Sequence, residues 1–121
     1  MKTVNKALFT NGDMETTLIS QPFNVAQVYI YAVQCEWTGT PLGTIEVQAS
    51  CDPEGNVHSD GGPFPTTWTV VGGSSDPVSG PGSYLPNVIG IGYNWIRVVF
   101  TPTTPGSNAG ALNGRINLKG F

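Results

Sequence analysis

The sequence predicts an all-β protein, an antiparallel β-sandwich that is jelly-roll-like and has seven to eight strands. The 121 residues include 16 Gly and 10 Pro, well above the combined share of roughly 12% in average proteins. Charged residues make up only 11%, against roughly 25% in ordinary domains, which excludes long helices and coiled coils. Several segments alternate between apolar and polar residues, and no helix-length window holds a helical period. A chain of this length can bury one core, so residues 1–121 are predicted to form a single domain.

The N-terminal region predicts two weaker strands, over residues 3–10 and 16–20, around a turn at Asn11-Gly12. Residues 1–10 mix polar and apolar side chains and form either a terminal arm or an edge strand. As an arm, this segment would pair with the sheet edge of a neighbouring molecule through main-chain hydrogen bonds.

The next segment predicts a hairpin. Residues 25–37 are rich in β-branched and aromatic side chains and read as a central strand. Residues 38–43 have the composition of a turn, and residues 44–50 alternate with Ile45, Val47 and Ala49 on one face. A strand of this kind has one face in water.

The second half begins with a long exposed loop over residues 52–65, which is dense in Gly, Pro, Asn, Asp and Ser. Four further strands are predicted at residues 66–71, 83–88, 92–101 and 111–119. Pro86 interrupts the second of these and restricts it to a sheet edge. The last two strands should point Ile96, Val98, Phe100, Leu112, Ile116 and Leu118 inward and Asn113, Arg115, Asn117 and Lys119 outward.

Two cysteines, Cys35 and Cys51, permit one disulfide. A tight hairpin would set Cys35 opposite a residue near Glu46, which leaves the two Cα atoms farther apart than the roughly 7 Å that a disulfide tolerates. We therefore predict two free, buried thiols, in agreement with synthesis in a cytoplasm.

The charge pattern argues against nucleic acid and membranes as partners. The formal net charge is −3, and no two of the five cationic residues are adjacent. Nucleic acids and acidic lipid surfaces are bound through clustered positive charge, which this sequence lacks. The longest apolar run, residues 28–33, is too short to span a bilayer, and residues 7–9 are too short for a signal peptide.

No catalytic set is recognisable. The single histidine, His58, stands beside Ser59 and Asp60 in the Gly-rich loop. Neighbouring Ser, His and Asp do not form a triad, because a triad is assembled from separate parts of the chain. Phosphate-binding and dinucleotide-binding motifs are also missing. We predict that the protein is not an enzyme and has no cofactor.

Carboxylates offer a metal site as an alternative. The loop supplies four side chains of the type that binds Ca²⁺, namely Asp52, Glu54, Asn56 and Asp60. Their order departs from an EF-hand, so a solvated loop without metal is favoured. Glu36 and Glu46 lie on the two strands of the hairpin, where they are better explained as outward charges than as glycosidase carboxylates.

Six aromatic residues are the candidates for an interface, namely Tyr29, Tyr31, Trp37, Trp68, Tyr93 and Trp95. Aromatic side chains on an outer face would form an apolar patch of the kind that marks a partner interface, or a surface on which sugars stack. The same residues also suit the core of a small sandwich. The sequence leaves both interpretations open.

Five segments carry a resemblance to a known class of proteins, and they cover most of the chain from residue 25 onward. They are residues 33–40 (VQCEWTGT), 43–52 (GTIEVQASCD), 67–69 (TWT), 92–102 (GYNWIRVVFTP) and 110–120 (GALNGRINLKG). Together they resemble the small β-sandwich structural proteins of tailed bacteriophages. The motifs are scaffold patterns rather than a catalytic signature.

The resemblance implies a virion component made in the host cytoplasm. The subtype it implies first is a capsid decoration (cement) protein, which binds the outer head and stabilises capsomer contacts. Its partners would be the major capsid protein or other virion proteins, and it would be a homo-oligomer, either a dimer or a trimer. The alternatives are a tail or fibre accessory protein, or a carbohydrate-binding β-sandwich that uses an exposed Trp such as Trp37 or Trp68.

Overall fold

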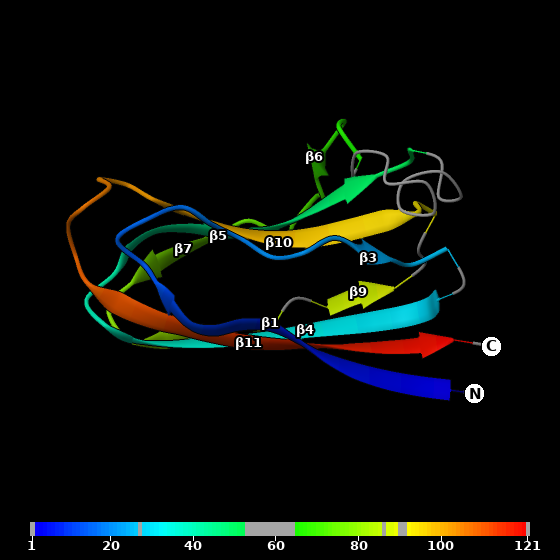
Figure 1. Cartoon of the computed structure of the whole chain (residues 1–121), viewed down its shortest axis with the longest axis horizontal. Helices are drawn as coiled ribbons and strands as arrows, with labels where there is room; N and C mark the ends of the chain where they lie inside the picture. The colour runs from blue at the N-terminus through cyan, green and yellow to red at the C-terminus, as the bar shows by residue number, and fades with distance from the viewer. Residues whose placement is uncertain (1, 27, 53–64, 86, 90–91, 121) are drawn as a thin grey trace.

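The computed structural model describes residues 2–26, 28–52, 65–85, 87–89 and 92–120, which form strands, turns and irregular connections without a helix. Two sheets face each other across one core (Figure 1). Sheet A contains β1, β11, β4, β8 and β9, and sheet B contains β2, β3, β10, β5, β6 and β7. The strands are β1 (Lys2–Asp13), β2 (Leu18–Ile19), β3 (Phe23–Asn24), β4 (Val28–Gly39), β5 (Leu42–Ser50), β6 (Thr69–Val70), β7 (Asp76–Ser79), β8 (Gly82–Tyr84), β9 (Asn87–Ile89), β10 (Trp95–Pro102) and β11 (Gly110–Gly120).

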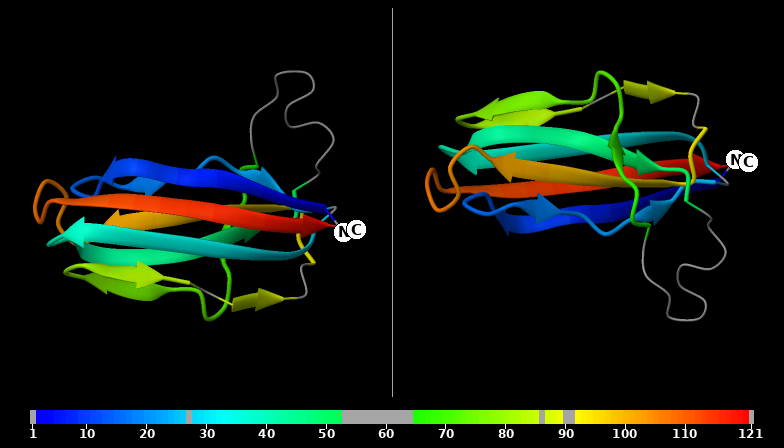
Figure 2. Two further views of the ribbon diagram at one scale, coloured as in Figure 1. Left: turned by 90° about the horizontal axis from the view of Figure 1, so that it is seen from below. Right: turned by 90° about the horizontal axis from the view of Figure 1, so that it is seen from above.

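The strand order is that of a jelly roll. β2 and β3 pair with the same side of β10, β6 and β7 with the same side of β5, and β8 and β9 with the same side of β4. The eleven strands of the described residues therefore occupy eight positions. Numbered in chain order, with each of these three pairs counted once, the positions run 1-8-3-6 across sheet A and 2-7-4-5 across sheet B. Figure 2 shows β1, β11 and β4 side by side. All pairings among the described residues are antiparallel, so the predicted class is confirmed, and the predicted seven to eight strands correspond to these eight positions and not to the eleven separate strands.

The core forms where the alternating apolar faces of the two sheets meet. Nine of the fully buried side chains come from β4, β5, β10 and β11, namely Val33, Cys35, Ile45, Val47, Ile96, Val98, Phe100, Leu112 and Ile116. The side chains predicted to point inward from β5, β10 and β11 are buried, apart from Ala49, which is half-buried. Burial of each large aliphatic side chain contributes about 1.5–3 kcal/mol.

The predicted hairpin of residues 25–37 and 44–50 is wrong, because β4 and β5 belong to different sheets. Gly39 has φ 89°, and a Cβ there would lie 2.5 Å from the carbonyl oxygen of Ala109. The next N–H, of Thr40, bonds that same oxygen at 2.9 Å, and Pro41 has no N–H with which to continue the ladder. The chain therefore leaves sheet A at Gly39 and enters sheet B at β5.

Both predicted N-terminal strands are present, as β1 and β2, but β1 continues through Asn11-Gly12, where the turn was predicted. β1 pairs with β11 from Lys2 opposite Gly120 to Asp13 opposite Ala111, with two irregularities in the register. Asn11 takes φ 50° within this irregular part, and the chain turns only after Asp13. Residues 2–10 are therefore an edge strand of this domain's own sheet.

Two predicted elements are shorter or divided. Residues 66–71 contain only β6, because the N–H groups of Thr66 and Thr67 bond the Oδ2 atom of Asp52, at 2.9 and 3.3 Å, and not a neighbouring strand. The edge strand predicted around Pro86 consists of β8 before it and β9 after it. β7 was not predicted, since it contains Pro77, yet proline is tolerated on an edge strand.

Candidate functional site: the outer face of sheet A

The six aromatic candidates do not form one surface. Tyr31, Trp37 and Trp95 are 2%, 6% and 2% exposed and lie in the interior. Trp68 and Tyr93 are half-buried, and only Tyr29 is largely exposed. For the three buried residues, the interface prediction is corrected to a core role.

Two of these rings, those of Tyr31 and Trp37, have their polar atoms hydrogen-bonded inside the protein. The hydroxyl groups of Tyr31, on sheet A, and Tyr93, just before β10 of sheet B, are 2.7 Å apart. Burial, together with this hydrogen bond, raises the pKa of Tyr31 above its ordinary value. The indole N–H of Trp37 donates to the carbonyl oxygen of Gly80 at 2.7 Å. An aromatic side chain with a satisfied polar end is a favourable core residue.

Trp68 belongs to a polar cluster on sheet B. The guanidinium carbon of Arg97 lies 4.4 Å from the centroid of the Trp68 ring, a cation–π arrangement. The Nε atom of Arg97 donates to Gln48 at 2.8 Å, and the side-chain amide of Gln48 donates to Glu46 at 2.9 Å. Partial burial lowers the pKa of Arg97. One face of the Trp68 ring is thus already covered by the protein itself.

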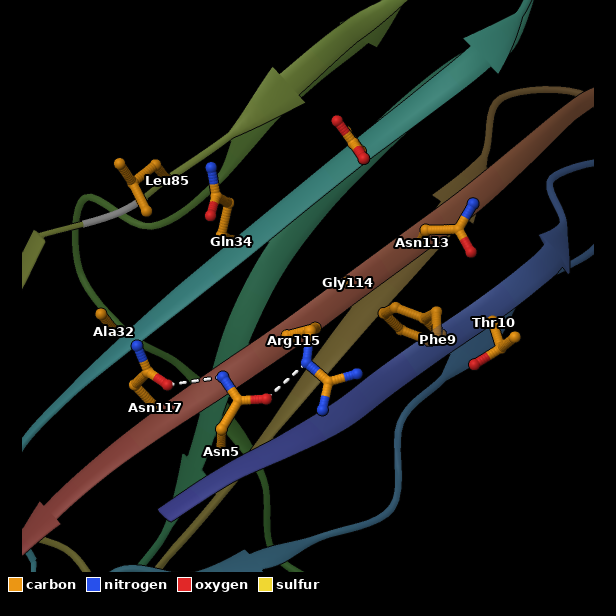
Figure 3. Close-up of a pocket in the computed structure, with 11 residues that line it drawn as sticks. Asn5, Phe9, Thr10, Ala32, Gln34, Leu85, Asn113, Gly114, Arg115 and Asn117 are labelled. Carbon is orange, nitrogen blue, oxygen red and sulfur yellow. Dashed lines mark hydrogen bonds between the residues drawn. The ribbon is translucent and has the colours of Figure 1, made fainter. Parts of the chain in front are cut away.

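A hollow on the outer face of sheet A has a volume of about 550 Å³ (Figure 3). We call it the amide groove. It is lined by Asn5, Phe9, Thr10, Ala32, Gln34, Glu36, Leu85, Asn113, Gly114, Arg115 and Asn117. The groove crosses β1, β11 and β4, whose pairing brings together residues from both ends and the middle of the chain.

Strand register sets the side chains of the groove in rows. Asn5 lies opposite Asn117, and Asn117 lies opposite Ala32. One row further along, Arg115 lies opposite Gln34. Outward side chains of neighbouring strands are cross-strand neighbours, so these groups share one surface. The small Ala32 leaves space beside the longer amides.

Hydrogen bonds fix one wall of the groove. The side-chain N–H of Asn5 donates to Oδ1 of Asn117 at 2.6 Å, and Oδ1 of Asn5 accepts a bond from Nε of Arg115 (Figure 3). Asn113 accepts a bond from the backbone N–H of Asn11 at 2.9 Å. These bonds hold the amide planes in place and leave the remaining donors and acceptors for a ligand.

Apolar side chains stand on two sides of the groove. Leu85, between β8 and β9, is 65% exposed, and Phe9 projects from β1 on the opposite side (Figure 3). Phe9 is placed there by a β-bulge, because the register skips from Ala7 opposite Arg115 to Phe9 opposite Gly114. Bulges commonly redirect side chains beside binding sites.

The other predicted site residues do not assemble. His58, Ser59, Asp60, Glu54 and Asn56 lie outside the described residues. Within the described ranges, no three Asp, Glu, His or Cys side chains are placed to share a metal ion.

The paired carboxylates and the cysteines are also separated. Glu36 and Glu46 lie on different sheets. Both cysteines are free, as predicted, but only Cys35 is buried, while Cys51 is exposed at the end of β5. Burial raises the pKa of the Cys35 thiol to about 12.

Sequence reasoning named Asn113, Arg115 and Asn117 as outward residues but did not predict the groove. Its other two amide residues, Asn5 and Gln34, come from strands whose place beside β11 depends on long-range pairing. The available signal was the alternation of long polar side chains, two of them amides, on the last strand.

Comparison with known proteins supports the fold and adds no family. No protein-family model matches the sequence, and no curated protein matches it. The structure is similar to the crystal structure of SPBc2 prophage-derived protein YomS, with a TM-score of 0.50 and 10% identity over 97% of this chain and 96% of that chain. The crystal structure of PirA gives a TM-score of 0.48 and 16% identity, over 96% and 92%. The described residues contain no helix long and apolar enough to cross a membrane.

Proposed function

We propose that the chain is a non-enzymatic structural protein of a phage virion, and specifically a capsid decoration protein that binds the outer head and stabilises capsomer contacts. The observation that supports this most is the similarity to a prophage-derived protein, which extends over 97% of the chain. Jelly rolls are also a recurrent architecture of viral capsid proteins. Because one fold supports many functions, the proposal has to be tested on particles.

The surface offers features suited to a protein partner. β1 is a 12-residue strand at the edge of sheet A, and among the described residues it pairs only with β11. Its other edge therefore presents main-chain groups to which a strand of a capsid protein or of a second copy can add. The expected assembly is a homodimer or homotrimer bound to the major capsid protein or another virion protein.

The first experiment locates the protein. Particles of the phage that encodes the chain are purified on a density gradient, analysed by mass spectrometry and labelled with antibody for electron microscopy. We expect labelled heads, and we expect particles that lack the protein to release DNA at a lower temperature. Absence from purified particles would refute a virion role, and labelling confined to tails would replace decoration by the tail or fibre alternative.

A further inference from the structure

The chemistry of the amide groove is that of a site for hydroxyl groups. Asn5, Gln34, Asn113 and Asn117 each carry an amide, which both donates and accepts hydrogen bonds. A sugar hydroxyl also does both, so a surface of amides can match several hydroxyl groups of unequal orientation. The side chain of Gln34 is exposed and makes no hydrogen bond to any described residue.

We infer that the amide groove binds a short, neutral oligosaccharide. Amide groups would bond the hydroxyls, while Phe9 and Leu85 would contact the C–H faces of the sugar rings from the two sides. The volume of about 550 Å³ falls within the range of small-ligand sites, roughly 300–1,000 Å³. This inference goes beyond the proposed virion role and does not depend on it.

Charge in the groove selects against other ligands. Among the described residues that line it, Arg115 and Glu36 carry the charge, and their charges cancel. A phosphate or sulfate ligand requires clustered positive charge, which one Arg beside one Glu does not supply. A protein partner is less well matched, since interface cores are enriched in aromatic residues, Met and Arg, whereas the groove is lined mainly by amides and other small or polar groups.

The binding experiment uses the full chain and defined probes. Maltohexaose, cellohexaose, xylohexaose and mannohexaose are titrated by calorimetry, with a heparin hexasaccharide as the charged comparison. We expect saturable binding of at least one neutral probe and none of heparin. Gln34→Ala should weaken binding about tenfold, the effect of losing one or two hydrogen bonds. The fold should persist, because Gln34 is exposed.

A matched control is available on the other sheet. Gln48→Ala removes a glutamine from β5, in sheet B, and should leave the Kd unchanged. Leu85→Ala removes the exposed apolar contact and should weaken binding as Gln34→Ala does. Failure of every neutral probe to bind, or an unchanged Kd in both groove variants, would overturn the inference. It would equally be overturned if the groove variants reduced attachment to particles and left sugar binding intact.

Discussion

The hydrogen bond between Tyr31 and Tyr93 joins the two sheets, and its loss should have an asymmetric effect on stability. The hydroxyl oxygens are 2.7 Å apart, and Tyr31 is 2% exposed whereas Tyr93 is half-buried. Tyr93→Phe leaves the Tyr31 hydroxyl buried without its partner, which costs about 1–3 kcal/mol. Tyr31→Phe leaves a hydroxyl with partial access to water, so the loss should be nearer the value of one hydrogen bond, about 0.5–1.5 kcal/mol.

Thermal unfolding followed by circular dichroism measures both variants. For 121 residues, the entropy of unfolding is about 0.25 kcal/mol/K, so each kcal/mol lowers the Tm by about 4 °C. We expect a drop of about 8 °C for Tyr93→Phe and about 4 °C for Tyr31→Phe. The double variant should lose less stability than the sum of the two single losses, since it removes both polar groups and leaves no buried hydroxyl without a partner. A larger loss for Tyr31→Phe, or strict additivity, would refute the reasoning.

Three further predictions concern cysteines and glycines. Ellman's reagent should modify the exposed Cys51 in the native protein and the buried Cys35 only after unfolding. Burial raises the pKa of Cys35 from 9.0 to about 12 in the folded protein. The neutral, buried thiol therefore contributes its full stability below pH 9, and this contribution is lost as the pH rises toward 12. Urea midpoints should therefore fall less steeply with pH from 9 upward in Cys35→Ala. Gly43→Ala places a Cβ 2.3 Å from a backbone oxygen of the paired strand and should cost about 1–3 kcal/mol; Gly72→Ala, with no heavy atom within 4 Å, should be neutral.

Alternation along single strands was sufficient to predict the inner faces of the sandwich. The inward positions of β10 and β11 follow from period-two patterns of residues such as Ile96 and Ile116. Alternation fixes which side of a strand is apolar and not which strand lies beside it. That is why the connection between β4 and β5, decided by Gly39 and Pro41, was predicted as a hairpin although it crosses between the sheets.

Three of the six aromatic candidates are core residues for a related physical reason. Large aromatic side chains suit both a core and an interface, and the difference depends on whether their polar atoms find partners inside the protein. Tyr31 and Trp37 find them in Tyr93 and Gly80, from segments distant in sequence. The amide groove depends even more on long-range pairing, since Asn5 and Asn117 are separated by 112 positions.

If the protein both decorates a particle and binds sugar, it must attach to the particle in an orientation that leaves the amide groove exposed. The amide groove occupies the outer face of sheet A, between the edge strand β1 and the strands β8 and β9. A decoration protein that docked through this face would bury the groove against the capsid. Docking through the free edge of β1 or through sheet B would leave the groove open to solvent. Gln34→Ala should then weaken sugar capture by intact particles about tenfold without changing how many copies they carry.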